Sequence, residues 1–305
     1  MTQRRLVIAG GSGRLGSLLQ TALQNQFEVR VLTTSAAPPA WKCDLTSIAE
    51  AEIALAGAHT VVFLAKVATP PARLIQGATV DLDLLMADSV SRAASRVGAE
   101  HLVFFACGEN DPREPILRAS EVKLSVLRGG GPDPVAALVE LVNSPQDRAL
   151  PAWSSSDEAL PAGHRASRVW SIQRFERPVA ASAAALARAY FEWLPSAVPL
   201  LRVERVEQTW LISSLGVEAL ILRHSPGRSE PDCFVLDMVG GALVSGPRGR
   251  FEFRVLRDGS FCVALIDFAP SLPWPLYRAT QAIAHARVMR SFGKALDAKT
   301  LVPRE

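Results

Sequence analysis

The 305-residue sequence has only four cysteines, and they lie far apart in the chain: Cys43, Cys107, Cys233 and Cys262. None belongs to a CxxC pair, and their spacing does not match the disulfide framework of a small secreted domain. This scarcity argues against a disulfide-stapled fold and predicts a reduced, cytoplasmic protein.

Long apolar runs and blocks of one charge are also missing. No apolar run approaches the ~18 residues that a membrane-spanning helix needs, so we expect no transmembrane segment. The 33 basic and 30 acidic residues are interspersed and give a net charge of +3, which argues against a nucleic-acid partner. The five histidines contain no HxxxH pair, and no metal site is predicted.

What the sequence does have is a run of glycines at a spacing of three, Gly10, Gly13 and Gly16, directly after the apolar residues 6–9. In a strand–turn–helix unit the first glycine permits a tight bend and the second lets the backbone approach a pyrophosphate. The third lets the helix pack close to the strand. Apolar residues at helical spacing follow, so the pattern favours a dinucleotide-binding turn over a glycine-rich turn that only packs.

The chain is long enough for two domains, because 305 residues exceed the roughly 150 of a typical domain. In the first half, strands are expected at residues 6–9, 27–32, 59–65, 101–106 and 124–128, with helices between them at 48–55 and 80–97. This alternation predicts an α/β fold, a doubly wound parallel sheet of the Rossmann type, over residues 1–145. Residues 146–167 have two prolines, a run of three serines and no periodicity, which predicts a linker.

From residue 168 onward the order of elements changes. A strand is expected at 169–175 and a helix at 180–193, followed by strands at 205–213, 219–223, 233–239, 250–256 and 261–268. A long helix with an apolar stripe is expected at 276–296. Residues 168–305 therefore predict an α+β domain with an antiparallel sheet around a long C-terminal helix, a helix-grip arrangement that often leaves an apolar cavity.

The glycine turn, the Cys43-Asp44-Leu45 step and the segments 61–65 and 124–130 are together similar to the short-chain dehydrogenase/reductase superfamily. The resemblance is to its extended or atypical branch, with NmrA-like and epimerase-like members. It implies an NAD(P)-binding Rossmann domain in which Asp44 touches the adenine ring and residues 64–66 line the cofactor.

The superfamily's catalytic Tyr-x-x-x-Lys is absent, because the chain has only two tyrosines, Tyr190 and Tyr277, and neither has a lysine four residues later. The residues between the fifth and sixth strands are too few for the usual catalytic helix. The superfamily's catalytic serine would fall near Ala106 or Cys107, which cannot replace its hydroxyl. No catalytic residue is therefore assigned.

The second half resembles a START-like helix-grip domain through residues 250–254, 267–270 and 272–277. This resemblance implies a pocket for an apolar small molecule. Tyr277, Gln281 and His285 are spaced to share one helical face, where they either line a cavity or else satisfy one another against the sheet or meet solvent.

The second strand ends in Thr33-Thr34-Ser35, without the carboxylate that usually selects NAD. Arg14 lies inside the glycine turn, where an arginine suits a 2′-phosphate, although a solvated first-turn arginine is an equal alternative. We therefore expect NADP in preference to NAD. The predicted cofactor-binding residues are Gly10, Gly11, Ser12, Gly13, Arg14, Leu15, Gly16, Thr33, Thr34, Asp44, Leu45, Leu64, Ala65, Lys66 and Cys107.

Taken together, these features predict an NAD(P)(H)-binding oxidoreductase that acts on an apolar small molecule without the usual tyrosine. The alternative is a non-catalytic protein that senses a dinucleotide or binds a small ligand. An enzyme needs open space where the nicotinamide would lie, whereas a sensor could fill that space with side chains from residues 107–113. A nucleotide-sugar epimerase or dehydratase ranks lower, because it ordinarily depends on the same missing tyrosine.

Overall fold

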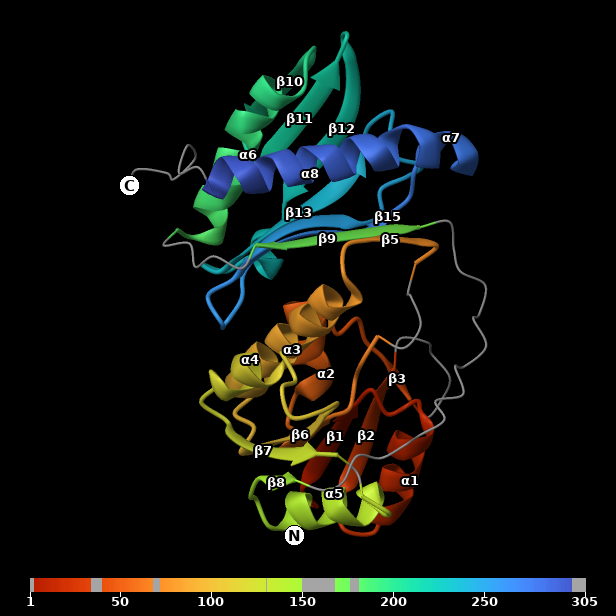
Figure 1. Ribbon diagram of the computed structural model, residues 1–305, viewed down its shortest axis with the longest axis vertical. Coiled ribbons are helices and arrows are strands. Elements are labelled where there is room, and N and C mark those ends of the chain that lie inside the picture. The colour runs from red at the N-terminus through yellow and green to blue at the C-terminus, as the bar shows by residue number, and fades with distance from the viewer. Residues whose placement is uncertain are drawn as a thin grey trace. The chain divides into compact units, whose positions relative to one another are not determined.

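The computed structural model describes residues 3–33, 40–67, 72–129, 131–149, 168–175 and 181–297. Its contacts divide the chain into two compact units (Figure 1). The first unit consists of Met1–Ala68 and Leu82–Ala159, and the second consists of Thr69–Asp81 and Leu160–Glu305. The second unit thus takes a short segment from the first half of the chain, which the sequence did not indicate. The boundaries 1–145, 146–167 and 168–305 stay predictions, since most of 146–167 lies outside the described residues.

A parallel sheet forms the centre of the first unit, with strand order β3-β2-β1-β4-β6-β7-β8. Every neighbouring pair in it is parallel. The order reverses between β1 and β4, and in open α/β sheets ligands bind at such a switch point, beyond the carboxyl ends of the strands. The strands are β1 (Arg5–Ala9), β2 (Glu28–Thr33), β3 (Trp41–Lys42), β4 (Thr60–Phe63), β6 (His101–Ala106), β7 (Lys123–Arg128) and β8 (Arg148–Ala149).

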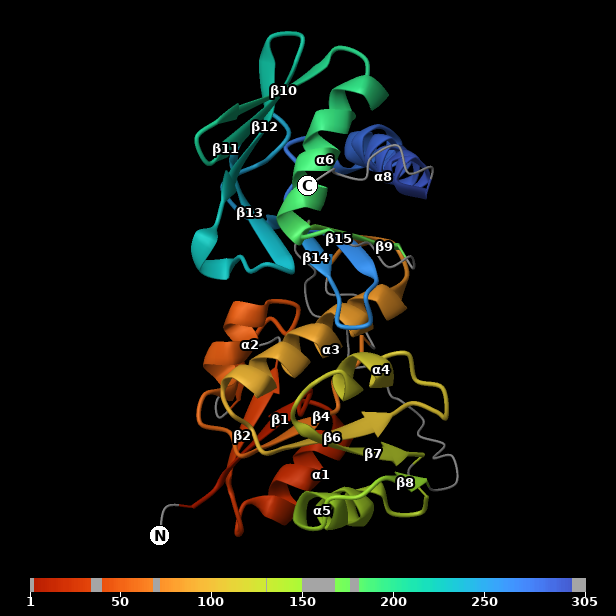
Figure 2. The same ribbon diagram turned by 90° about the vertical axis from the view of Figure 1, so that its left-hand side faces the viewer.

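Helices cover both faces of this sheet, as Figure 2 shows. On one face α1 (Arg14–Leu23) and α5 (Pro134–Asn143) pack through Leu19, Leu23 and Leu138 onto fully buried residues of β1. The other face carries α2 (Ile48–Leu55), α3 (Thr79–Arg96) and α4 (Glu114–Arg118). Burial of each large apolar side chain contributes roughly 1.5–3 kcal/mol, so both helical layers stabilise the sheet.

Short polar residues mark where several of these helices begin. The Ser47 hydroxyl accepts a hydrogen bond from the backbone N–H of Glu50 at 3.3 Å at the start of α2. The Asp133 carboxylate accepts one from Ala136 N–H at 2.9 Å, and Pro134 follows it as the first residue of α5. These caps satisfy N–H groups that the helix itself leaves unpaired, and proline suits the first helical position because that N–H needs no partner.

The second unit is built on an eight-stranded sheet with order β10-β11-β12-β13-β14-β15-β9-β5. All neighbours are antiparallel except β5, which runs parallel to β9. The strands are β5 (Leu74–Gln76), β9 (Val169–Phe175), β10 (Leu201–Val206), β11 (Thr209–Ser214), β12 (Val217–His224), β13 (Cys233–Gly240), β14 (Arg250–Val255) and β15 (Phe261–Phe268). A short 3-10 helix, η1 (Pro226–Arg228), lies between β12 and β13.

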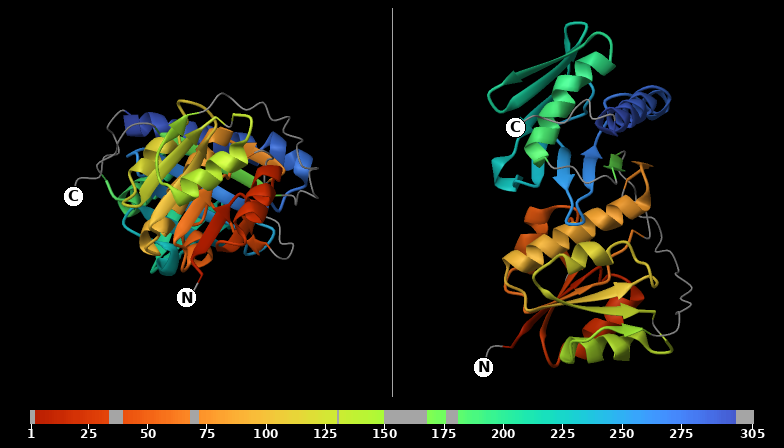
Figure 3. Two further views of the ribbon diagram at one scale, coloured as in Figure 1. Left: turned by 90° about the horizontal axis from the view of Figure 1, so that it is seen from below. Right: turned by 60° about the vertical axis from the view of Figure 1, so that its left-hand side comes forward.

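Two helices, α6 (Ala183–Ala197) and α8 (Gln281–Asp297), lie along one face of this sheet (Figures 2 and 3). An aromatic cluster joins them to the strands: the Tyr190 ring of α6 lies 5.0 Å from Phe292 of α8 and 5.5 Å from Phe251 and Phe253 of β14. The short α7 (Trp274–Ala279) precedes α8. The predicted fold class is therefore confirmed: a doubly wound parallel sheet, then an antiparallel-rich sheet with a long C-terminal helix.

Two predicted elements of the second half were wrong in extent. Residues 205–213 do not form one strand, because the chain reverses at Glu207, whose φ is +53°, and the two sides become β10 and β11. The predicted helix 276–296 is broken at Thr280, whose φ and ψ of −123° and −80° are not helical. Tyr277 therefore belongs to α7, and the expectation that it shares one helical face with Gln281 and His285 is wrong.

Candidate dinucleotide site at the switch point

The turn between β1 and α1 needs glycine at its first position for two separate reasons. Gly10 has a φ of +89°, a conformation that side chains rarely adopt. A Cβ atom there would also lie 2.5 Å from the backbone N and Cα of Ala65, which follows β4. The turn is therefore pressed against the end of the neighbouring strand, at the switch point.

Gly16 allows the helix to approach the turn. A Cβ on Gly16 would lie 2.3 Å from the Cα of Gly11, and one on Gly11 would lie 2.6 Å from Cγ1 of Val31 in β2. The first turn of α1 thus packs directly against the backbone of Gly11. This contact places the N-terminus of α1 close to the carboxyl ends of β1 and β2.

Gly13 differs from the other glycines of the turn, because the space where its side chain would lie is empty. No heavy atom lies within 4 Å of the position that its Cβ would take, and its backbone is extended, with φ −83° and ψ 172°. It is the N-cap of α1, no side chain caps this helix, and the first turn contains no acidic residue. An open helix N-terminus with uncapped N–H groups fits the pyrophosphate of a dinucleotide. Ser12 and Arg14 on either side are exposed.

Other predicted site residues lie at the same sheet edge. Leu64 follows β4 and donates its backbone N–H to the Ala9 carbonyl at 2.8 Å, which holds the end of β4 beside β1. Lys66 is exposed and Ala65 is buried. Thr33 is the last residue of β2, and Thr34 lies outside the described residues.

Asp44 and Leu45 have local structural contacts in the loop between β3 and α2. Asp44 Oδ1 accepts hydrogen bonds from the backbone N–H of Thr46 at 2.9 Å and from its hydroxyl at 2.6 Å. The Asp44 N–H donates to Glu50 Oε2 at 2.9 Å. Leu45 is buried. These contacts fix the loop that leads into α2, while an adenine contact of Asp44 stays a prediction.

Sequence reasoning missed a buried ion pair just beyond β6. The Arg113 guanidinium donates to both carboxylate oxygens of Asp111, from Nε at 2.9 Å and from Nη2 at 2.6 Å. Its Nη1 donates to the Ala65 carbonyl at 2.7 Å, and Nη2 lies 3.1 Å from Cys107 Sγ. The guanidinium carbon also lies 4.8 Å from the centre of the Phe104 ring. Asp111-Pro112-Arg113, five residues after the end of β6, was the available signal, since two opposite charges there can form one pair.

Both members of this pair stay charged. Burial alone would lower the pKa of Arg113, but its hydrogen bonds to Asp111 and the charge of that carboxylate raise it. Burial would raise the pKa of Asp111, but the bonds from Arg113 and from the Cys107 N–H lower it. The pair ties together the loops after β4 and β6, because Arg113 bonds to Ala65 and Asp111 to Cys107.

A second buried carboxylate lies beneath the loop after β4. Asp83 Oδ1 accepts the backbone N–H of Val67 at 2.7 Å, and the side chain is largely buried. Burial raises the pKa of Asp83, partly offset by this bond and by the charges of Arg113 and Lys66.

No tyrosine relay is present among the described residues of the first unit. Between β6 and β7 the only helix is α4, which has five residues. Tyr190 and Tyr277 both belong to the second unit and are buried. Burial raises the pKa of both phenols, that of Tyr277 to about 12, whereas a proton relay needs a lowered value.

His285, the histidine singled out from the sequence, makes a structural contact in the second unit. Its Nε2 lies 3.0 Å from the Ser171 hydroxyl of β9, and burial lowers its pKa to about 4. Gln173 Nε2 donates to the same hydroxyl at 3.0 Å. His285 therefore makes its hydrogen bond across to the sheet and not with Tyr277 or Gln281, and the expectation that these three residues satisfy one another is not met.

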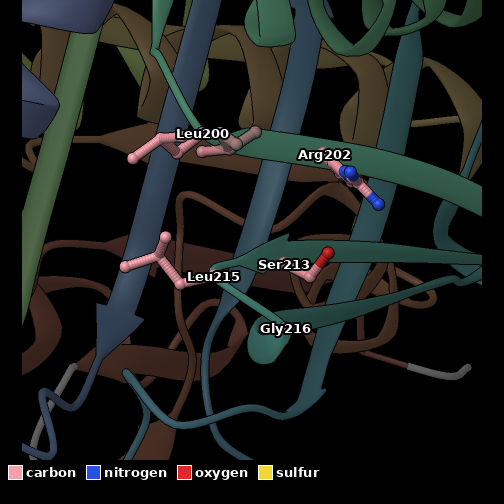
Figure 4. A pocket seen from close by; sticks show the side chains of 6 residues that line it. Leu200, Arg202, Ser213, Leu215 and Gly216 are labelled. Carbon is pink, nitrogen blue, oxygen red and sulfur yellow. The ribbon is translucent and has the colours of Figure 1, made fainter.

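A hollow of about 390 Å³ lies at the outer end of the second sheet (Figure 4). Leu200 and Arg202 lie along one strand segment there, and Ser213, Leu215 and Gly216 lie on the strand and turn beside it. Arg202 is its one charged lining residue, so the hollow has no cluster of chemical groups that would indicate a catalytic site.

The part of the chain that the structure describes has neither a metal-binding cluster nor a membrane-spanning helix. No group of three or more histidine, cysteine, aspartate or glutamate side chains is arranged to hold a metal ion. No described helix combines the length and apolar character that crossing a bilayer requires.

Comparison with known proteins matches part of the chain to one family. Residues 6–122 match the model of the NAD dependent epimerase/dehydratase family. This segment begins in β1 and ends just before β7, so it contains the glycine turn and the Arg113–Asp111 pair. None of the curated proteins matches the chain.

Several solved structures are similar in fold to about half of the chain. A nucleoside-diphosphate-sugar epimerase from Staphylococcus aureus is 14% identical with a TM-score of 0.40, over 50% of this chain and 72% of that one. The Bordetella bronchiseptica enzyme WbmG in complex with NAD is 22% identical with a TM-score of 0.35, over 43% and 54%. Uronate dehydrogenase from Agrobacterium tumefaciens is 16% identical with a TM-score of 0.39, over 52% and 79%. The chain thus spans only about half the length of WbmG.

Proposed function

We propose that the first unit binds a nicotinamide dinucleotide, with its pyrophosphate at the N-terminus of α1. The open space at Gly13 carries this proposal, because a buried packing turn would have filled it. Gly10 and Gly16 bring the helix end to the switch point, where a dinucleotide binds in sheets of this order. The partial match to the NAD dependent epimerase/dehydratase family supports the same ligand. When bound, the nicotinamide supplies or accepts a hydride.

NADP is the dinucleotide we propose. β2 ends at the buried Thr33, and the sequence after it offers the hydroxyls of Thr34 and Ser35 and no carboxylate to repel a 2′-phosphate. Arg14 is exposed in the first turn of α1, within the same turn that would hold the phosphates. A guanidinium can bind a phosphate with two parallel hydrogen bonds, which favours NADPH over NADH.

The Arg113 side chain favours a non-catalytic use of this dinucleotide. It is 3% exposed and lies beyond the ends of β4 and β6, held by Ala65, Asp111 and Cys107. An oxidoreductase needs space for a substrate beside the nicotinamide, and a buried ion pair at this edge reduces it. The alternative is an oxidoreductase that acts on an apolar small molecule and takes its proton from water or from the second unit.

For the second unit we propose a START-like helix-grip fold that binds an apolar small molecule. Its order of one strand, one helix, a run of antiparallel strands and a long C-terminal helix supports the fold. The four cysteines carry free thiols, which supports the predicted reducing, cytoplasmic location.

Calorimetric titration of the full chain with NADPH and with NADH tests the proposal. We expect NADPH to bind about tenfold more tightly, in line with one added phosphate contact. Gly13→Trp should abolish binding, because it fills the open space that the pyrophosphate needs. The matched control is Gly227→Trp, since Gly227 also has no heavy atom near its Cβ position but lies in the second unit.

Absence of binding to either dinucleotide, or unchanged binding by a folded Gly13→Trp variant, would overturn the proposal. An activity assay separates the non-catalytic use from the oxidoreductase: NADPH is mixed with apolar aldehydes and ketones, and its oxidation is monitored by the absorbance of reduced nicotinamide. If NADPH is oxidised, the proposal of dinucleotide binding stands, but the protein is an oxidoreductase and its use of the dinucleotide is catalytic.

A further inference from the structure

β10 is the last strand at one edge of the eight-stranded sheet, and its outer side has no partner strand among the described residues. Arg202, Glu204 and Val206 on this strand are exposed, and Leu200 just before it is 70% exposed. Figures 1 and 2 show β10, β11 and β12 together at this end of the sheet. An exposed edge strand offers unpaired backbone groups to another strand.

The hairpin geometry decides which backbone groups of β10 face outward. Val206 pairs directly with Thr209, and only two residues join them. The pair that closes a two-residue hairpin exchanges backbone hydrogen bonds, and the bonded positions then alternate along the strand. The N–H and C=O groups of Val206, Glu204 and Arg202 therefore point to β11, and those of Leu201, Val203 and Arg205 point outward.

We propose that this edge binds the same edge of a second copy of the chain, as an antiparallel pair of β10 strands about a twofold axis at Val203. In this register Val203 lies opposite its own copy, and Leu201 lies opposite Arg205 of the second copy. These are the positions whose backbone groups face outward. The Leu201 N–H already donates to the Val198 carbonyl at 3.3 Å. Four hydrogen bonds would therefore form between the copies, two at the Val203 pair and one from the Arg205 N–H to the Leu201 carbonyl at each of the two Leu201–Arg205 pairs.

The side chains of β10 select this register. With the axis at Val203, Arg202 of each copy lies opposite Glu204 of the other, in the closer, non-hydrogen-bonded type of pair. An axis at Arg202, Glu204 or Arg205 would instead place two like charges opposite each other. An axis at Leu201 would leave most of the strand without a partner, since β10 begins there.

Val206 adds an exposed apolar side chain at the end of the strand. It is 49% exposed and lies on the same side of the sheet as Arg202 and Glu204. Leu200 is not part of this register, because its φ is +66° and β10 begins only at Leu201. The charges on β10 thus discourage pairing with unrelated strands while being complementary to a copy of the strand itself.

The expected dimer is weak and depends on concentration. One pair of six-residue strands covers less than the roughly 1,600 Å² of a standard interface. Exposed ion pairs are also screened by salt. We therefore expect a reversible monomer–dimer equilibrium that shifts toward the monomer as the salt concentration rises.

Sedimentation velocity of the full chain over a range of concentrations tests this proposal. Wild type should show a dimer at about 100 µM protein in low salt. Arg202→Glu and Glu204→Arg should each weaken dimerisation by about tenfold, because each puts like charges opposite one another twice. An equimolar mixture of these two variants should restore the dimer, since every cross-strand pair between them is again attractive. Arg287→Glu is the matched control: Arg287 is exposed on α8 and should have no effect.

A monomeric wild type under these conditions would overturn the proposal. So would a dimer that is unchanged in both single variants, because it would then form through another surface. A mixture that stays monomeric while both single variants are folded would exclude the register centred on Val203.

Discussion

Arg113 Nη2 lies 3.1 Å from the sulfur of Cys107, at the edge of the first sheet where a dinucleotide would bind. Arg113 comes six residues after Cys107, so the loop after β6 combines an exposed thiol with a buried cation.

Thiol labelling should separate Cys107 from the other three cysteines. Cys107 is exposed, whereas Cys43, Cys233 and Cys262 are buried. Burial raises the pKa of Cys43 to about 12 and that of Cys233 further still, which keeps both as unreactive thiols. We expect one thiol per folded chain to react quickly with a disulfide reagent and the others to react only on unfolding. Cys107→Ala should remove the fast phase, and a fast phase that persists would contradict the assignment.

Removal of Arg113 should destabilise the first unit. Arg113→Met leaves Asp111 buried without its cation, which costs about 3 kcal/mol of unfolding free energy. Adding Asp111→Asn to the same chain removes the unpaired buried charge. The double variant should therefore lose less unfolding free energy than the two single variants lose in sum. Urea denaturation of the four proteins gives the coupling between the residues, and strict additivity would show that the pair is not stabilising.

Substitution by alanine should destabilise the protein at Gly10 and have little effect at Gly13. Gly10→Ala puts a methyl group 2.5 Å from Ala65 and forces alanine into a positive φ, so we expect a loss of about 2 kcal/mol or more. Gly13→Ala meets no atom and keeps an ordinary extended backbone, so its unfolding free energy should change by less than about 1 kcal/mol. Thermal and urea unfolding measure both. Equal losses would contradict the open space at Gly13.

His101 should make stability depend on pH. It is buried, its Nε2 lies 3.0 Å from the Ser125 hydroxyl, and burial, with the charge of Lys123, lowers its pKa to about 4. Between pH 6.5 and 4 the unfolded chain therefore binds a proton that the folded chain does not, so stability falls as pH falls through this window. The slope from one such histidine is at most about 1.4 kcal/mol per pH unit.

His101→Gln isolates this contribution, because glutamine can still hydrogen-bond but does not titrate. The difference in unfolding free energy between wild type and variant should change between pH 6.5 and 4 and be constant above pH 7. A constant difference across the whole range would show that His101 stays exposed to solvent.

Much of the fold could be predicted because its signals are local. The glycine turn, the apolar strands and the 80–97 helix follow from residue spacing alone, and α3 begins at Thr79 and ends at Arg96. His101, in contrast, is a polar residue of β6 that the structure buries against Ser125. Burial of a polar strand residue depends on its partner from β7, which periodicity does not reveal.

The features that sequence reasoning missed depend on distant parts of the chain. The reversal at Glu207 has no glycine to mark it, although its φ is positive. β5 has three residues and is a strand only because β9 lies beside it. In the candidate site the glycines were predictable, whereas the bond from Arg113 to the Ala65 carbonyl joins two loops that follow different strands.

The position of β5 also constrains how this protein is made and how it can have arisen. During synthesis Leu74–Gln76 leaves the ribosome long before β9, so this segment stays without its neighbour while the flanking chain completes the first unit. The two units are therefore interleaved along the gene. A recombination event or a protease cut between residues 150 and 167 would leave a strand of the second sheet attached to the first half. Unlike domains joined end to end, these two cannot be exchanged as separate modules.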